Sequence, residues 1–325
     1  MSQHFLLSAR ARSLSLATVL RMSDEEAETA FRNLRWEGGN AICPHCGCPT
    51  VYECRRPSGS LRFRCKACRK DFSITSGTLF AFHKMPLRNY LAATAIFVNE
   101  VKGKSALALS RDLDVQYKTA FVLAHKLREA MASELRGMKV GGEGETVEVD
   151  GAYFGGHVKP ANFKENRRDR RKAENQTGKR QVVVVARERG GNTLPAVFKS
   201  EASAQSWIVA RVAKDTRLMA DEAPSWNDLH AKFQVGRIDH GKLYSDLNGT
   251  YTNGAESFFS RLRRAEIGHH HHISGPYLVR YAQESAWRED HRRMDNGRQV
   301  RAIGALAMAA PTSIDWCGYW QRTAR

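Results

Sequence analysis

No stretch of this sequence is both long and apolar enough to cross a membrane. The longest apolar run, YLAATAIFV at Tyr90–Val98, is far shorter than the roughly 20 residues that a membrane-spanning helix needs. Acidic residues are also scarce, since 34 Asp and Glu stand against 51 Lys and Arg, for a net charge of +17. A charge of that size attracts polyanions, which are nucleic acids or anionic membrane surfaces.

The N-terminal residues also lack the charged, apolar and cleavage regions of a secretory signal. Their Ser and Arg content and lack of acids resemble a transit peptide only weakly, and we favour an exposed or helical arm. We therefore expect a cytoplasmic protein with no membrane partner.

The sequence has seven cysteines, and four of them form two Cys-x-x-Cys pairs. Cys43 and Cys46 are separated from Cys65 and Cys68 by 18 residues, a spacing typical of a tetrahedral thiolate zinc site. Four protein ligands leave no open position, so we expect the zinc to be structural. The alternative is a set of buried cysteines, but this segment has too few large apolar residues to fold without such a link.

Composition and periodicity divide the chain into segments. Ser23, followed three residues later by Glu26, predicts a capping box at the start of a helix, and the Gly-rich KVGGEGE (139–145) predicts a linker. The expected organisation is an N-terminal helical arm (1–38), a zinc ribbon (39–82), a helix-turn-helix (83–138), a catalytic domain (145–293) and a C-terminal tail (294–325).

A helix-turn-helix is predicted by two helices that a break at DLDV separates, one over Ser105–Asp112 and one from Gln116. The exposed start of the second helix, Gln116, Tyr117 and Lys118, would face DNA bases or phosphates. The alternative is a three-helix packing module that does not bind DNA.

Beyond the linker, the chain is expected to form a mixed α/β domain. TVEVDGAYFGG alternates like a strand, and QVVVVARERGGNTLPAVF reads as a hairpin around GGN. Helices and short strands alternate after it. Between strand and hairpin, 157–180 reads as a mobile basic loop, and its DNA-binding candidates are Arg167, Arg168, Arg170 and Arg171.

Three acidic residues stand at positions where element ends can bring them together. Asp150 and Asp221 are each expected at the end of a strand, and Glu256 lies in the first turn of a helix. Carboxylates converging in this way can hold hard divalent cations, and two such ions support in-line phosphoryl displacement. Taken singly, Asp150 fits a turn residue, Asp221 an N-cap and Glu256 a charge that favours the helix dipole.

The ribbon cysteines, KTAFVLAHKLREAM, VEVDGAYFGG, ADEAPSW and TNGAESFFSRLRRAEIGHHHHISGPYLVRYAQESAWRED together resemble bacterial insertion-sequence transposases with a zinc ribbon and an acidic-triad (DDE-type) catalytic domain. The resemblance extends from about Ser23 to Gly297. It implies a ribonuclease-H-like catalytic domain, dependence on Mg²⁺ (or Mn²⁺), and cleavage and strand transfer at the ends of the element. It also implies a nucleoid-associated bacterial protein that acts as a homo-oligomer on double-stranded element ends and target DNA.

Carried over by position, the resemblance makes Asp150 and Asp221 metal ligands, with Glu256 or Asn253 as the third. We favour Glu256, whose full charge neutralises cations better, and assign Asn253 as the N-cap of the helix. Arg261, Arg263 and Arg264 follow where the family places DNA-contacting residues, and Gly151 stands where many relatives carry an acid. We interpret His269–His272 as a DNA-contacting or packing turn rather than a metal site.

The leading hypothesis is therefore a transposase. A non-catalytic zinc-ribbon and helix-turn-helix regulator derived from a transposase, or a nuclease of similar fold, are the alternatives. The terminal-repeat sequence, the target preference and the oligomeric state cannot be predicted from one sequence.

Overall fold

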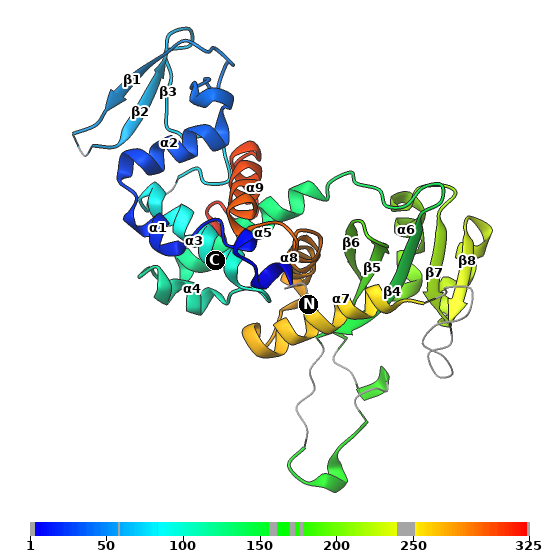
Figure 1. The fold of residues 1–325 in the computed structure, drawn as a ribbon. Coiled ribbons are helices and arrows are strands. Elements are labelled where there is room, and N and C mark those ends of the chain that lie inside the picture. Colours follow the sequence, from blue (N-terminus) through cyan, green and yellow to red (C-terminus); the bar gives the residue numbers. More distant parts are fainter. Residues whose placement is uncertain are drawn as a thin grey trace. The chain divides into compact units, whose positions relative to one another are not determined.

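The computed structural model of the protein describes residues 4–57, 59–82, 84–155, 161–169, 173–175, 178–238 and 251–323. The chain forms two compact units (Figure 1). Unit 1 combines Met1–Glu134 with His291–Arg325, and unit 2 is the continuous segment Leu135–Asp290. Within the described ranges, no helix combines the length and apolar character that crossing a membrane requires.

Unit 1 contains a small antiparallel sheet with the order β1-β2-β3. Its strands are β1 (Val51–Arg55), β2 (Leu61–Cys65) and β3 (Asp71–Phe72), and all three lie within the segment predicted as a ribbon. A small aromatic core supports them: Phe63 is fully buried, stacks on Phe72 at a centroid distance of 5.2 Å and meets the edge of Trp36 at 5.7 Å.

Helices surround the rest of unit 1. The predicted capping box at Ser23 is present, since the Ser23 hydroxyl accepts the N–H of Glu26 and the Glu26 carboxylate accepts the N–H of Ser23. The elements are η1 (Phe5–Leu7), η2 (Ala9–Ala11), α1 (Leu16–Arg21), α2 (Asp24–Arg35), η3 (Glu37–Gly39), α3 (Leu87–Asn99), α4 (Ala106–Asp112) and α5 (Tyr117–Glu134).

Residues 294–325, expected as a tail, instead contain α9 (Asn296–Ala309) and α10 (Tyr319–Thr323). Helix α9 packs against α2, α3 and α5. Ile303 and Ala307 lie four residues apart and are fully buried, which is the spacing of one helix face. The C-terminal segment is therefore part of the core of unit 1.

The described strands of unit 2 form one sheet in the order β6-β5-β4-β7-β8. Strands β4, β5 and β6 pair antiparallel, whereas β7 pairs parallel with both β4 and β8. The bounds are β4 (Thr146–Phe154), β5 (Gln181–Glu188), β6 (Thr193–Phe198), β7 (Arg217–Asp221) and β8 (Gln234–Ile238). The predicted hairpin around GGN is β5–β6.

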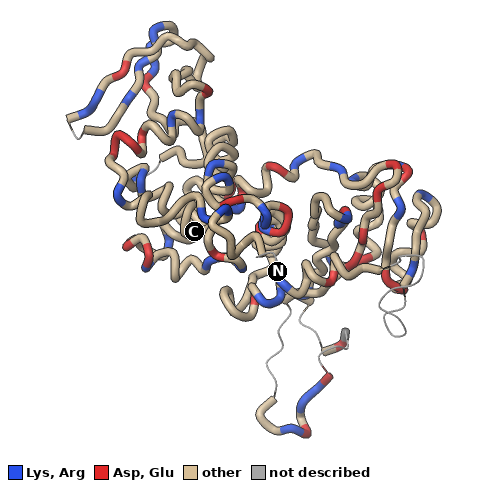
Figure 2. The backbone as a smooth tube through the Cα atoms, viewed as in Figure 1, with Lys and Arg blue, Asp and Glu red and all other residues tan. Residues whose placement is uncertain are grey.

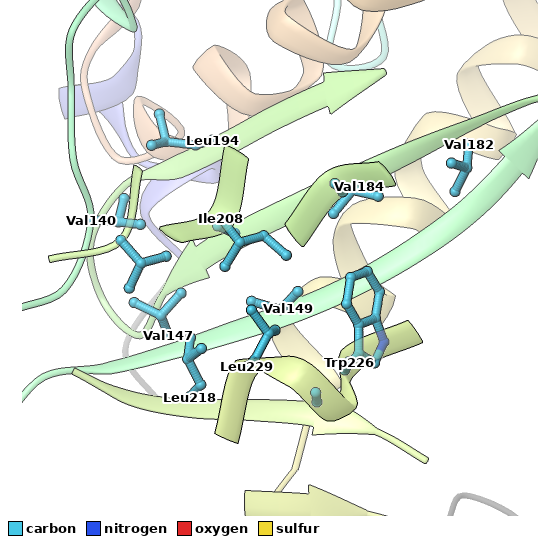
Figure 3. Close-up of a cluster of buried hydrophobic side chains, with 14 of the residues drawn as sticks. Val140, Val147, Val149, Val182, Val184, Leu194, Ile208, Leu218, Trp226 and Leu229 are labelled. Carbon is cyan, nitrogen blue, oxygen red and sulfur yellow. The ribbon is translucent and has the colours of Figure 1, made fainter. Parts of the chain in front are cut away.

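Each face of this sheet carries its own core, because side chains alternate along a strand. Val147 and Val149 of β4 pack with Ile208 and Trp226 on one face (Figure 3). Ala152 and Phe154 pack with α7 (Asn253–Ala265) and α8 (Leu278–Asp290) on the other face. By the same alternation, Glu148 and Asp150 lie on the face that α7 covers.

The first face is covered by η6 (Glu201–Ala204), α6 (Gln205–Arg211) and η7 (Pro224–Ala231). The first of the helices predicted after the hairpin therefore begins as a 3₁₀ turn, η6, and continues as the short helix α6. Part of the predicted linker is structured as well, since Val140 is fully buried and forms a parallel bridge with Val212. The other short elements of unit 2 are η4 (Lys164–Asn166), η5 (Ala173–Asn175), η8 (Glu266–His270) and η9 (Gly275–Tyr277).

Candidate functional site

The four paired cysteines come together at one end of the ribbon. The Sγ atoms of Cys43, Cys46, Cys65 and Cys68 all lie within 4.8 Å of one another. Cys43 and Cys68 are 3.7 Å apart and Cys46 and Cys65 are 3.6 Å apart, too far for a disulfide bond and suited to ligands around one ion. Four thiolates fit a closed structural Zn²⁺ site.

The two Cys-x-x-Cys turns have the same backbone geometry. Gly47 donates its N–H to the carbonyl of Cys43, and Arg69 donates its N–H to the carbonyl of Cys65. Both residues have positive φ, 73° at Gly47 and 59° at Arg69. Backbone N–H groups of Cys68 and then Ala67 also point at Cys65 and help to lower the pKa of its thiol to about 6, which favours the thiolate that binds a metal.

Basic side chains around the ribbon are partly engaged with acids. Arg55 pairs with Glu28 at 2.8 Å, and Arg62 pairs with Asp71. Arg56, Arg64, Lys66, Arg69 and Lys70 remain exposed, and basic residues are spread over the ribbon strands (Figure 2). These exposed cations are available to meet phosphates.

Of the three residues predicted at the start of the second helix of the helix-turn-helix, Tyr117 and Lys118 open α5, and Gln116 immediately precedes it. Gln116, Tyr117 and Lys118 are exposed, but α10 lies beside them. The indole N–H of Trp320 donates to the carbonyl of Lys118 at 3.2 Å, and the Lys118 ammonium lies 5.3 Å from the Trp320 ring. The first turn of α5 is therefore packed against the C-terminal segment, which the sequence analysis did not anticipate.

Asp150 and Asp221 lie side by side on neighbouring strands of unit 2. Asp221 ends β7, as predicted, whereas Asp150 lies inside β4, which continues to Phe154. The strand-end prediction for Asp150 is therefore wrong, because AYF beyond it continues the pairing with β5. The parallel pairing of Val149 with Ala220 puts the next two residues, Asp150 and Asp221, at the same level of the sheet.

Local hydrogen bonds orient the Asp221 carboxylate. Its Oδ1 accepts the indole N–H of Trp226 at 2.7 Å and the N–H of Ala223 at 3.2 Å. Trp226 is itself fully buried, so it gives the carboxylate a rigid support. The alternative interpretation of Asp221 as an N-cap is wrong, because the N-cap of the following helix, η7 (Pro224–Ala231), is Ala223.

Glu256 reaches the same place from the first turn of α7. A hollow of about 450 Å³ opens between β4 and α7, and Asp150, Glu256, Arg263 and Arg264 line it. Asn253 is the first residue of the helix rather than its N-cap, which is Thr252. The capping role predicted for Asn253 is therefore wrong.

The acids act on one another electrostatically. Burial raises the pKa of Asp150 to about 7, and the charges of Asp221, Glu201 and Glu256 add to the rise, while the Gly151 N–H opposes it. The carboxylate oxygens of the acids are less tightly gathered than the thiolates. Among the described residues, the four cysteines, whose ligand atoms all lie within 4.8 Å of one another, are the one group close enough to hold a metal ion as they stand. Carboxylate oxygens around a hollow are the kind of ligand that hard divalent cations prefer.

Glu201 is a carboxylate of this neighbourhood that the sequence analysis missed. It opens η6, and its side chain lies over Gly151, where a Cβ would come within 2.8 Å of its Oε1. Burial and then the charge of Asp221 raise its pKa, and Ser225 donates to it at 3.4 Å. The one available signal was Gly151 itself, a small residue where relatives carry an acid.

The basic candidates of α7 have different surroundings. Arg263 and Arg264 line the hollow, but Arg261 pairs with the buried Glu289 of α8. In the histidine run, His270 packs against Tyr281 at 4.6 Å and His271 has a positive φ of 57°, which fits a packing turn. Of the basic loop, Arg167 and Arg168 are exposed, and Arg170 and Arg171 lie outside the described residues.

The raised pKa of Asp150 predicts a pH-dependent stability when Mg²⁺ is absent. The folded state binds the proton more tightly than the unfolded state, so stability is greatest below about pH 4 and falls as the pH rises through about 7. We expect Asp150→Asn to be more stable than the parent at pH 8, by on the order of 4 kcal/mol, and by clearly less at pH 5. Urea unfolding in zinc-containing, magnesium-free buffer measures this difference.

Asp228→Asn, at an exposed position of η7, is the matched control and should show no such gain. Equal stability of Asp150→Asn and the parent at both pH values would mean that Asp150 is not held in an acid-rich, desolvated position.

Two family models match the chain. Residues 22–71 match a transposase zinc-ribbon domain, and residues 141–290 match an ISXO2-like transposase domain. The chain is also 23% identical, over 88% of its own length and 98% of the relative, to an uncharacterized protein in transposable element ISH50 of Halobacterium salinarum. No solved structure matches it. The chain therefore carries, in one sequence, a zinc ribbon of the transposase type over 22–71 and an ISXO2-like transposase domain over 141–290.

Proposed function

We propose that this chain cleaves DNA at the ends of its insertion sequence and joins the ends to target DNA by phosphoryl transfer. The observations that carry the proposal are the placement of Asp150 beside Asp221 on neighbouring strands and of Glu256 in the hollow that Asp150 also lines. Mg²⁺ (or Mn²⁺), when bound, would activate the attacking oxygen and stabilise both oxygens of the displacement. Asp150, Asp221 and Glu256 are the residues that would hold it.

The remaining side chains of the site have distinct tasks in this proposal. Trp226 and Ala223 orient the carboxylate of Asp221. Arg263 and Arg264 line the same hollow and would bind the phosphates on either side of the cleaved bond. Glu201, above Gly151, adds a further carboxylate beside the site.

The sheet of unit 2 supports a ribonuclease-H-like assignment. A hairpin of antiparallel strands, followed by strands that add in parallel on the other side of the first, gives the order β6-β5-β4-β7-β8. We assign the ribonuclease-H-like fold to 145–293 on this order. We assign recognition of element ends to the ribbon (39–82) and the helical segment (83–138), with Gln116, Tyr117 and Lys118 at the start of α5 and further phosphate contacts from the loop at 157–180.

The experiment is a strand-transfer assay with the zinc-loaded full chain, Mg²⁺ and duplexes that carry the terminal sequences flanking its reading frame. We expect nicking at the end of the element and a second product in which that end is joined to target DNA. Cleavage without joining would identify a nuclease. Binding of the ends with no cleavage in Mg²⁺ or Mn²⁺ would identify a regulator, and either result would overturn the proposal.

A further inference from the structure

Glu148 is a fully buried acid two residues before Asp150 on the same strand. It is only 1% exposed, and a buried carboxylate is costly unless its oxygens are satisfied. Oε1 accepts the Nε–H of Arg189 at 2.9 Å, and Oε2 accepts the backbone N–H of Ala255 at 2.9 Å. One oxygen thus binds Arg189, which directly follows β5, and the other binds the first turn of α7.

Arg187 completes this arrangement from the neighbouring strand. It is paired directly with Glu148 in the β4–β5 register, and its Nη1 donates to the carbonyl of Gly254 at 2.8 Å. The carbonyl of Gly254 and the N–H of Ala255 belong to one peptide group. Glu148 and Arg187 therefore bind both polar atoms of the peptide group that joins Gly254 to Ala255, one residue before Glu256.

This grip replaces the usual cap of the helix. The N-cap residue Thr252 makes no side-chain capping bond, and the orphan N–H of Ala255, the third residue of α7, is instead accepted by Glu148. A helix start normally takes such a bond from its own N-cap side chain, which fixes the helix only to itself. Here the bond fixes the helix to the strand that carries Asp150.

Gly254 is required by the close approach. A Cβ at this position would come within 2.6 Å of Glu148 Oε2 and 3.4 Å of Arg187 Cδ, although the backbone of Gly254 does not need glycine for its φ. The absence of a side chain at Gly254 therefore leaves room for the Glu148 carboxylate.

Further bonds hold the grip itself in place. Nη2 of Arg187 pairs with the buried Glu289 of α8 at 2.7 Å, and Nη2 of Arg189 donates to the carbonyl of Tyr251 at 2.8 Å. The Arg189 guanidinium also lies 3.5 Å from the Tyr251 ring centroid. Glu148 and Arg187 are thus fixed on both sides of the chain that enters α7.

We propose that Glu148 and Arg187 are positioning residues that set the place of Glu256 relative to Asp150. Glu148 lies two residues from Asp150 on the same face of β4, and Glu256 is the residue after Ala255, whose N–H Glu148 accepts. The rigid strand and the first helical turn are therefore tied at a point next to both acids. The inference rests on the proposed function, since it requires Glu256 to be a metal ligand.

The test uses the full-length, zinc-loaded protein and Glu148→Gln. An amide can present its oxygen to only one of the two N–H donors that the carboxylate accepts, so the grip is broken while the side-chain volume is kept. Glu284→Gln is the matched control, because Glu284 of α8 is equally buried and pairs with Arg288 at 2.8 Å. Both variants replace a buried, arginine-paired glutamate, but only one contacts the start of α7.

Two measurements besides catalysis follow the effect. We expect Glu148→Gln to lose hydrogen-exchange protection in the peptide that begins α7, and to weaken Mn²⁺ binding, measured by calorimetry, by about 10- to 100-fold, as for other side chains that hold metal ligands in place. Glu284→Gln should change neither. Unchanged hydrogen-exchange protection in Glu148→Gln would overturn the proposal. So would an unchanged Mn²⁺ affinity of Glu148→Gln, provided that Glu256→Gln does weaken Mn²⁺ binding.

Gly254→Ala keeps the inference testable if Glu148→Gln does not fold. Its methyl group displaces the Glu148 carboxylate, so we expect the same loss of exchange protection and the same weakening of Mn²⁺ binding. In the double variant with Glu148→Ala, these effects should be smaller than the sum of the two single effects. Additive effects of Gly254→Ala and Glu148→Ala would overturn the proposed coupling between these two residues. If Glu256→Gln itself leaves Mn²⁺ affinity and cleavage intact, the assignment of Glu256 as ligand fails, and the positioning role falls with it for that separate reason.

Discussion

Glu256→Gln is expected to lose Mg²⁺-dependent strand cleavage while it keeps its fold and its DNA binding. The substitution removes one negative charge from the hollow that Asp150 also lines and changes no core residue, because Glu256 is exposed in the first turn of α7. A ligand to a catalytic cation contributes to several kcal/mol of transition-state stabilisation, and about 1.4 kcal/mol is a factor of ten, so we expect a loss of about 100- to 1000-fold.

Asp150→Asn and Asp221→Asn should lose at least as much, because both positions are central to the site. Asn253→Ala should lose much less, because the N-cap is Thr252, so its cost in stability is small as well. Glu143→Gln, at an exposed loop position before β4, is the control that should remain active. Full activity of Glu256→Gln, together with loss in Asn253→Ala, would transfer the ligand role to the amide.

Cys65→Ser is expected to abolish zinc binding and to unfold the ribbon. The cluster of four thiolates is supported by only a few aromatic side chains, such as Phe63 and Phe72. Structural zinc sites of this type contribute on the order of 10 kcal/mol to folding, more than that small core can replace. Metal analysis should fall from one zinc per chain to none, and exchange protection of β1 and β2 should be lost.

Cys54→Ser is the matched control, because Cys54 lies exposed on β1 and outside the cluster. It should retain one zinc and a protected ribbon. A Cys65→Ser variant that keeps its ribbon folded without zinc would mean that the aromatic core alone is sufficient.

Sequence patterns predicted the local elements better than the relations between them. Spacing of the cysteines located the metal cluster, alternation located β4, and the strand-like runs on both sides of GGN located β5 and β6, because these signals lie within short segments. Asp150 was placed at a strand end because a polar residue interrupts an apolar run. The structure shows that the strand continues, and that the parallel partner β7 is what ends at this level.

Other features depend on contacts between residues distant in the chain. Glu201 approaches Gly151 only once η6 has folded over the sheet, and Glu148 contacts Ala255 across 107 positions. Likewise, the residue type of Asn253 predicted an N-cap, but the N–H of Ala255 in the first turn of α7 is accepted by Glu148 of strand β4. No local propensity encodes these relations, so they could not be predicted from the sequence.

The division of the chain into units also sets an order for events during synthesis. Unit 2 is one continuous segment, so it can fold once residue 290 has left the ribosome. Unit 1 cannot, because Ile303 and Ala307 of α9 are part of its core, so the N-terminal residues must wait for a helix translated near the end of the chain. A chain truncated after unit 2 would contain every residue of the unit 2 sheet but would lack α9, so its N-terminal unit would be incomplete.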